Sequence, residues 1–391
     1  MLFYKSPGVV VGIVSCLVVF GVSVQVPVAA ARVDDGAERK IIVFTESVTS
    51  PEERASVLAR HGLAVSKDLP VLHGVSAYLS RYALSDLVHD PAIVRIDDDV
   101  RVYALASTNR QVLPWGVDRV DAERAWPVGA TGKGVTVAVV DTGVSTGHPD
   151  IKANLVTGYN ALSPWLRPTD DNGHGSHVAG IIGAVNNTVG VVGVAPSVKI
   201  MPVKVLDKWG SGYLSDIIAG MDWAVSHGAR VINLSLGTDA DIQSFHDAVR
   251  RAHDAGVTVV AAAGNSGGSV SYPAAYDEVI AVSATDQSNV LASFSSRGSQ
   301  VDIAAPGVGI YSTYKSTGYA TLSGTSMAAP HVAGAAALLL TTSPLGYGDH
   351  DNVWSSDEVR EKLMSTATDL GTAGTDDLYG AGLLHAYAAV Q

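Results

Sequence analysis

The sequence contains a single cysteine, and this residue, Cys16, lies inside an apolar run near the N-terminus. One thiol cannot form a disulfide within one chain, so a disulfide framework is excluded. If the protein works outside the cell, where small folds often depend on disulfides, another kind of interaction must hold its surface loops.

Charged residues are also scarce, at 16% of the chain, and basic residues are outnumbered by acidic ones. The formal net charge is −12, and the part after Leu105 holds 16 basic against 26 acidic residues. A phosphate-binding surface needs clustered Lys and Arg, so the composition argues against nucleic acid as a partner. We attribute the acidity to solubility, with a calcium-related role as the alternative.

What the chain does have is length and apolar content. Its 391 residues are 47% hydrophobic and include 40 glycines. That length allows one large domain and a smaller one, or two domains of average size. The balance favours a globular α/β core with many tight turns over a disordered or fibrous chain.

The first 31 residues have the layout of a secretory signal peptide. Lys5 is followed by an uncharged stretch from Ser6 to Ala30 that closes on small residues, and charge resumes at Arg32. This order predicts removal of residues 1–31 and secretion of a protein without a membrane anchor. The alternative is an uncleaved anchor, because the uncharged run is long enough to span a bilayer.

Residues 32–105 predict a small α+β unit with an open-faced sheet. Ser50 and Glu53 have capping-box spacing at the start of a helix. The expected order is β-α-β-α-β. The strands are expected at 40–45, 75–79 and 92–96, and the helices at 51–61 and near 84–89.

From residue 135 onward, continuous apolar runs alternate with helical patterns. Such runs, each followed by a helix, indicate parallel strands buried on both faces, so we expect a doubly wound, mostly parallel α/β sheet. The expected strands are 135–140, 199–206, 230–236, 257–263 and 279–284, and the expected helices lie near 174–185, 213–227 and 241–255.

Asp141 ends the first of these strands, in VAVVDTG. In doubly wound sheets, functional sites gather at the carboxyl ends of strands. Read alone, Asp-Thr-Gly is half of an aspartic-protease dyad or an ordinary turn. The dyad needs a second such motif, which the sequence lacks.

His174 lies at a glycine-rich entry into an apolar helix, in DDNGHGSHVAG. The second histidine, His177, raises the possibility of a metal site. Two histidines at i and i+3 without an intervening Glu do not match a zinc-protease pattern, so we interpret His177 as structural.

Ser326 lies in TLSGTSMAAPHVAG, where an extended stretch turns into a helix. A serine at a helix start is usually an N-cap. Here a helix of small residues follows, which leaves the hydroxyl at the surface of the sheet edge. The elbow motif of α/β-hydrolases is excluded because position 328 is alanine.

Together these three motifs resemble the signatures of the subtilisin-like serine proteases. The chain order Asp, His, Ser is that of subtilisin and differs from the orders in chymotrypsin and the α/β-hydrolases. The resemblance runs from about Gln111 to the C-terminus, with Ser176 standing where the family more often has threonine.

The resemblance implies an endopeptidase that acts on polypeptides. Ser326 would attack the scissile carbonyl, His174 would move the proton, and Asp141 would hold the imidazole. AAAGNSG resembles the oxyanion segment, so Asn265 and the backbone N–H of Ser326 would stabilise the oxyanion. A non-catalytic relative and an α/β-hydrolase esterase are the alternatives, and the complete residue set and its order argue against both.

The resemblance also implies where a peptide substrate binds. The segments Gly210-Ser211-Gly212 and Ser235-Leu236-Gly237 resemble strands that pair with an extended peptide. The S1 region would be lined by Leu236, Gly237, Gly264 and Ser271. The loop 265–272 contains no Asp or Glu, so we expect an apolar or broad P1 preference.

A structural calcium ion is the implied substitute for disulfides. The loop 184–196 resembles the high-affinity calcium loop of the family, and all-oxygen ligation suits Ca²⁺. The implied ligands are Gln111, Asp150, Val185, Asn187, Val189 and Val191. A second cation site near Ala274, Tyr276, Val279 and Asp302 is left open.

Residues 32–105 resemble the family's pro-segment, which assists folding and then blocks the catalytic domain, residues 106–391. Its tail, VRVYALA, would occupy the cleft and be cut by the enzyme itself, with Leu105 at P1. The pro-segment is thus an expected partner of its own catalytic domain, and the mature enzyme is expected to be a monomer.

Overall fold

The computed structural model describes residues 37–100, 111–344, 347–349 and 351–391. They belong to two compact units, Met1–Leu105 and Ala106–Gln391. Within the described residues, no helix has the length and apolar character needed to cross a membrane. The proposed signal peptide and the proposed cleavage region at 105–110 lie outside these residues.

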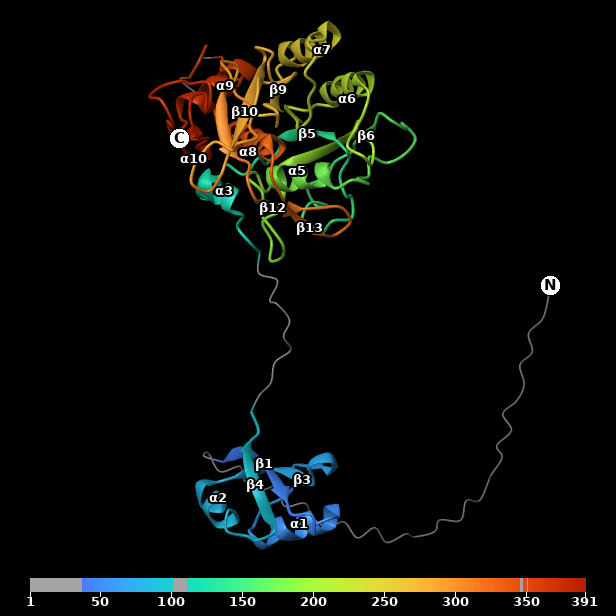
Figure 1. Ribbon diagram of the computed structural model, residues 1–391, viewed down its shortest axis with the longest axis vertical. Helices are drawn as coiled ribbons and strands as arrows, with labels where there is room; N and C mark the ends of the chain where they lie inside the picture. The colour runs from blue at the N-terminus through green and yellow to red at the C-terminus, as the bar shows by residue number, and fades with distance from the viewer. Residues whose placement is uncertain (1–36, 101–110, 345–346, 350) are drawn as a thin grey trace, which may run out of the picture. The chain divides into compact units, whose positions relative to one another are not determined.

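The N-terminal unit is a four-stranded antiparallel sheet with two helices (Figure 1). The strand order is β2-β3-β1-β4. The strands are β1 (Glu38–Phe44), β2 (Lys67–Leu69), β3 (Gly74–Leu79) and β4 (Ile93–Asp98), and the helices are α1 (Pro51–Arg60) and α2 (Arg81–Leu87). The sequence did not predict β2, because three residues are too few to show an apolar alternation.

Local chemistry explains the start of α1. The Ser50 hydroxyl accepts a hydrogen bond from the Glu53 N–H at 3.1 Å, and the Glu53 carboxylate accepts one from the Ser50 N–H at 3.0 Å. This is the capping box that the sequence predicts. Ile42 and Phe44 alternate along β1 and are buried together with Leu58 of α1, so one face of the sheet carries the core of this unit.

The C-terminal unit is built on a seven-stranded parallel sheet in the order β11-β10-β9-β8-β5-β7-β6. The strands are β5 (Thr136–Asp141), β6 (Tyr159–Asn160), β7 (Lys199–Lys204), β8 (Val231–Leu234), β9 (Thr258–Ala262), β10 (Val279–Thr285) and β11 (Ile303–Pro306). After β5, the chain forms β6 and β7 on one side of β5 and then β8 to β11 on its other side. This reversal of direction places a cleft at the carboxyl ends of β5 and β8.

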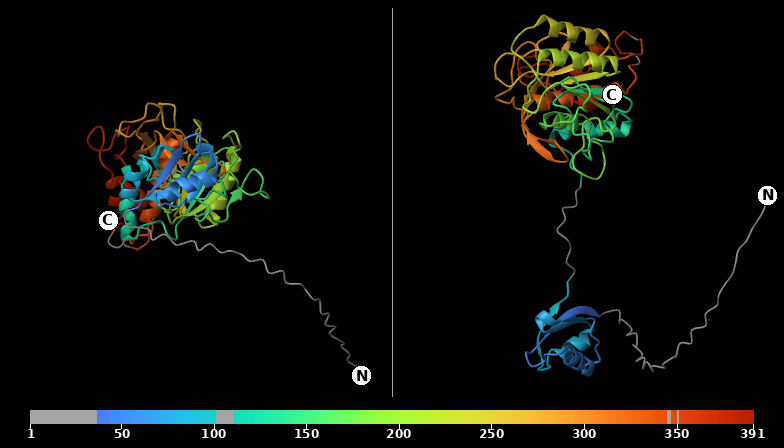
Figure 2. Two further views of the ribbon diagram at one scale, coloured as in Figure 1. Left: turned by 90° about the horizontal axis from the view of Figure 1, so that it is seen from below. Right: turned by 90° about the vertical axis from the view of Figure 1, so that its right-hand side faces the viewer.

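Helices cover both faces of this sheet (Figure 2). Val137 and Val139 belong to one core cluster with α5 (His174–Gly183) and α8 (Thr325–Leu339), whereas Ala138 and Val140 belong to another with α6 (Leu214–Ser226) and α7 (Gln243–Asp254). Successive side chains of a strand point to opposite faces, so β5 needs apolar residues throughout. The doubly wound fold expected from the sequence is confirmed.

Further elements complete the C-terminal unit. They are α3 (Trp115–Arg119), α4 (Ala122–Ala125), α9 (Ser356–Ser365), α10 (Ala386–Ala389) and the antiparallel pair β12 (Ile310–Thr313) and β13 (Tyr319–Leu322). Three-residue 3₁₀ turns lie at Pro70–Leu72 in the first unit and at Trp126–Val128 in the second.

Candidate active site

Asp141 and His174 meet at the carboxyl edge of the sheet. Asp141 is the last residue of β5 and is fully buried, and His174 is the first residue of α5. The His174 Nδ1 lies 2.9 Å from each carboxylate oxygen of Asp141. This contact assigns the proton to Nδ1 and leaves Nε2 as the acceptor nitrogen.

The surroundings of His174 favour its protonated form. Burial of the ring lowers its pKa, but the charge of Asp141, the hydrogen bond to it and the charge of Asp170 together raise the pKa of His174 above its ordinary value. The His174 side chain is still 27% exposed, so the ring can be reached from the cleft. Such a histidine accepts a proton readily once it is deprotonated by the medium.

Ser326 is the second residue of α8. Its hydroxyl donates to the Ser235 carbonyl at 3.2 Å, and the Ser235 hydroxyl donates to the Ser326 carbonyl at 2.9 Å. These two bonds hold the start of α8 against the segment that follows β8. In this structure the Ser326 hydroxyl therefore donates to Ser235 and not to His174, but a serine hydroxyl can rotate about its C–O bond and change its acceptor.

Asn265 follows β9 and faces the same region. Its Oδ1 accepts hydrogen bonds from both the N–H and the hydroxyl of Thr325, each at 2.9 Å. Because Oδ1 is engaged in this way, Nδ2 is the group left to donate. Thr325, which was not predicted from the sequence, therefore fixes the orientation of the Asn265 amide; its only sequence signal was its position next to Ser326.

Asn265 and Ser326 line one small pocket of about 210 Å³. The predicted S1 residues Leu236, Gly237, Gly264 and Ser271 all line it as well. None of its lining residues is charged. Asp239 lies close to its rim, where it accepts a hydrogen bond from the Ser271 hydroxyl at 3.4 Å.

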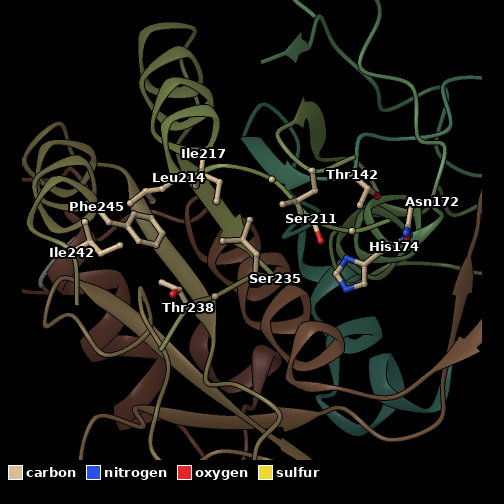
Figure 3. A pocket seen from close by; sticks show the side chains of 15 residues that line it. Thr142, Asn172, His174, Ser211, Leu214, Ile217, Ser235, Thr238, Ile242 and Phe245 are labelled. Carbon is tan, nitrogen blue, oxygen red and sulfur yellow. The ribbon is translucent and has the colours of Figure 1, made fainter. Parts of the chain in front are cut away.

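A larger pocket of about 580 Å³ opens beside His174 (Figure 3). The two predicted substrate segments, 210–212 and 235–237, both contribute to its lining, and Leu236 and Gly237 line the small pocket too, so the pockets form one continuous cleft. Apolar side chains that the sequence did not single out cover one end of the larger pocket: Leu206, Leu214, Ile217, Ile242 and Phe245.

The predicted calcium ligands converge in the structure. The Gln111 Nε2 lies 2.7 Å from the Val185 carbonyl, 3.0 Å from the Val191 carbonyl and 3.4 Å from the Asn187 Oδ1. Asp150 is fully buried and accepts hydrogen bonds from the Asn187 side chain at 3.1 Å and from the Val191 N–H at 2.8 Å.

These contacts place an amide nitrogen at the point where several oxygens meet. A half-turn of the Gln111 amide would turn Oε1 toward these oxygens and complete an all-oxygen shell, in exchange for the hydrogen bond that Oε1 accepts from the Asn187 N–H at 3.0 Å. Val189 belongs to the same loop, where its N–H donates to the Asn187 Oδ1 at 2.7 Å. In the described part of the chain, no three His, Cys, Asp or Glu side chains cluster as metal ligands, so a cation would depend on carbonyl and amide oxygens. The donor set fits Ca²⁺.

The second cation position, left open by the sequence, is arranged differently. The Asp302 Oδ1 accepts hydrogen bonds from the Arg360 Nε at 3.1 Å and Nη2 at 2.5 Å, and Arg360 also donates to the Asp277 carbonyl. The Asp302 Oδ2 accepts one from the Ala281 N–H at 2.8 Å. A guanidinium already neutralises this carboxylate, so the residues do not favour a metal ion here.

His177 fits the structural interpretation. It is fully buried, and its Nε2 donates to the carbonyls of Ile310 and Ala320 at 3.0 and 3.1 Å. Burial lowers the pKa of His177 to about 4, so the ring is neutral near pH 7. It joins α5 to the β12–β13 pair.

Comparison with known proteins agrees with this geometry. The model of the subtilase family matches residues 132–382. An alkaline protease of Shouchella clausii is 44% identical over 374 residues, which cover 93% of this chain and 94% of the relative. Subtilisin Savinase of Lederbergia lenta is 50% identical over 72% of this chain and 100% of its own length, and subtilisin E of Bacillus subtilis is 40% identical over 93% of each. The chain therefore belongs to the subtilase family and is a subtilisin-like serine protease.

Proposed function

We propose that this protease is a secreted endopeptidase in which Asp141, His174 and Ser326 form the catalytic triad. The observation that carries the proposal is the Asp141–His174 hydrogen bond at 2.9 Å, beside a cleft that continues to Ser326. The His174 Nε2 takes the proton of the Ser326 hydroxyl as its oxygen attacks the carbonyl carbon, and then gives that proton to the leaving amine. Water hydrolyses the acyl-enzyme by the same proton path.

The oxyanion of the tetrahedral intermediate is bound by two donors, the Asn265 Nδ2 and the backbone N–H of Ser326. The orientation of the Asn265 amide by Thr325 supports this role. Donors held in place before the reaction need no reorganisation as charge develops on the oxygen. A substrate in extended form adds itself between the segments 210–212 and 235–237 through backbone hydrogen bonds.

The small pocket receives the P1 side chain, and an apolar residue fits it best. Its lining residues are uncharged, and Asp239 at its rim already accepts a hydrogen bond from Ser271. The apolar end of the larger pocket then receives a second apolar side chain of the substrate. Burial of each apolar side chain contributes roughly 1.5–3 kcal/mol to binding.

The chain is made as a precursor for export, with a signal peptide at 1–31, a pro-segment at 32–105 and a catalytic domain at 106–391. Two observations support this organisation. The described residues fall into two compact units, and Savinase, matched over its whole length, covers only 72% of this chain. The pro-segment blocks the cleft until the enzyme cuts itself free.

The preference is tested by profiling the purified mature enzyme with a peptide library. We expect cleavage after Leu, Phe, Tyr or Met to exceed cleavage after Arg, and a serine-directed phosphonate to label Ser326. Asp239→Asn is the matched control and should leave that ranking unchanged. A profile dominated by basic P1 residues would overturn the preference. If cleavage after basic residues were then lost in Asp239→Asn, the Asp239 carboxylate would be the group that recognises them.

A calcium ion bound by Gln111, Asp150, Asn187 and the carbonyls of the loop 184–196 would cross-link the N-terminal end of the catalytic domain to this loop. Excess EDTA should then lower the thermal midpoint by several degrees, because a ligand at 100 times its Kd stabilises a fold by about 2.7 kcal/mol. Added Ca²⁺ should restore the midpoint, whereas Mg²⁺, which demands compact octahedral ligation, should not.

Asn187→Ala provides the control for calcium binding. Its thermal midpoint should be low and insensitive to EDTA. An unchanged midpoint and an unchanged autolysis rate of the wild-type enzyme in EDTA would contradict the assignment.

A further inference from the structure

Asp170 is a buried carboxylate that the proposed reaction does not use directly. It has 6% of its surface exposed and lies in the loop before α5. Its Oδ1 accepts hydrogen bonds from the Thr142 hydroxyl at 2.9 Å and from the N–H groups of Asn172 and Gly173 at 2.9 and 2.8 Å. Its Oδ2 accepts two more from Ser176, from the N–H at 2.9 Å and from the hydroxyl at 2.6 Å.

Thr142 connects this carboxylate to the end of β5. Its N–H donates to the Asp141 Oδ1 at 2.6 Å, and its hydroxyl, which donates to Asp170, accepts a hydrogen bond from the Gly175 N–H at 2.9 Å. Its carbonyl accepts one from the Lys204 ammonium at 2.7 Å. One residue therefore ties the strand end that carries Asp141 to the first turn of α5.

The start of α5 depends on these acceptors. The first N–H groups of a helix have no partner within it, and the cap residue Gly173 has no side chain to supply one. Asp170 accepts a hydrogen bond from the Ser176 N–H and so acts as an N-cap from outside the helix. A negative charge at this end is also favoured by the helix dipole.

The charged groups that face His174 come from several elements. Asp141 lies on β5 and Asp170 lies in the loop before α5, and the charges of both raise the pKa of His174. His177 of α5 is neutral near pH 7, because burial lowers its pKa to about 4. Lys204 of β7 is buried, and its ammonium is engaged by Asp171 at 2.7 Å and by two carbonyls.

We propose that Asp170 is a positioning residue for the Asp141–His174 pair. It fastens the end of β5 to the start of α5, and its charge stabilises the imidazolium that forms when His174 takes the proton of Ser326. The inference rests on the roles proposed above for these three residues. Neither the hydroxyl of Ser176 nor that of Thr142 can replace it, because a hydroxyl carries no negative charge.

The decisive variant is Asp170→Asn, which keeps the shape and removes the charge and one acceptor. We expect kcat to fall about 10–100-fold with KM changed less than about twofold, since misplacement of a catalytic pair costs rate more than binding. The acid limb of kcat/KM should also move about half a pH unit downward, because loss of a nearby negative charge lowers the pKa of His174.

Asp171→Asn is the matched control. It removes the same charge one residue away, from a carboxylate whose side chain is 53% exposed and bonded to Lys204. Solvent screens that charge, so its acid limb should move by less than about 0.2 units. A kcat of Asp170→Asn within threefold of wild type, or a loss of kcat without movement of the acid limb, would overturn the proposal.

Two further measurements cover poor folding and poor maturation of Asp170→Asn. In the full chain with Ser326→Ala, NMR titration of His174 should show the same downward shift on Asp170→Asn without any need for activity. Thr142→Val should lose activity as Asp170→Asn does, and Thr142→Ser, which keeps the hydroxyl, should restore most of it.

If His174→Ala retained activity, the proposed function would fail; if His174→Ala were inactive but Asp170→Asn unimpaired, only the role of Asp170 would fail.

Discussion

Replacement of Ser326 by alanine is expected to leave the precursor uncut. Without the hydroxyl no acyl-enzyme forms, and the loss of rate should be on the order of 10⁶. The change removes one oxygen at the second residue of α8, where the reciprocal bonds with Ser235 fall from two to one, so folding should persist. Expressed alone in a protease-free host, the variant should accumulate with Arg32 or a near neighbour as its N-terminus.

The wild-type chain should instead yield a protein that begins between Ala106 and Gln111. Cleavage within one molecule is favoured because the scissile bond is held beside the nucleophile, which replaces a bimolecular encounter. Mass spectrometry of the two N-termini is the measurement. Normal processing of the Ser326→Ala chain in that host would show that another enzyme matures the precursor, and self-cleavage would have to be abandoned.

Replacement of Asn265 by alanine should lower kcat about 100- to 1,000-fold. That magnitude is taken from subtilisin, where loss of the side-chain oxyanion donor has this effect. KM should change little, because the donor binds charge that exists only in the transition state. Steady-state kinetics on a soluble peptide separates the two constants.

Ser266→Ala is the control for the Asn265 variant. The Ser266 hydroxyl contacts the Ser296 hydroxyl at 3.3 Å and the Gly268 N–H at 3.2 Å, away from Thr325. Its kcat should stay near the wild-type value. Equal losses in both variants would point to a general disturbance of the loop rather than to a lost oxyanion donor.

The amino-acid sequence by itself determined the type and order of the main elements. The run VTVAVV predicts a buried strand at 135–140, and β5 occupies Thr136–Asp141. A strand buried on both faces must be apolar throughout, and this requirement is visible in a single sequence. The Ser50–Glu53 capping box was equally readable, because both of its partners lie within four residues.

The sequence also indicated which residues could do chemistry, since Asp141, His174 and Ser326 lie at strand or helix ends within distinctive motifs. The sequence could not predict which other side chains contact the residues of the site. The orientation of Asn265 depends on Thr325, 60 positions later, and the Asp302 carboxylate is neutralised by Arg360, 58 positions later. A local sequence pattern does not show which residues far apart in the chain come into contact.

The tertiary structure decided those contacts, and with them the shape of the cleft. The five apolar residues at its end come from the segment that follows β7, from α6 and α7 and from the residue that precedes α7, and the sequence marks each only as hydrophobic. Whether such a side chain enters the core or lines a pocket depends on how helices pack across the sheet. Asp170 shows the same limit. Four of the five hydrogen bonds that it accepts come from its own loop and the first turn of α5, but the bond from Thr142, 28 positions earlier, forms only when the end of β5 packs beside that loop.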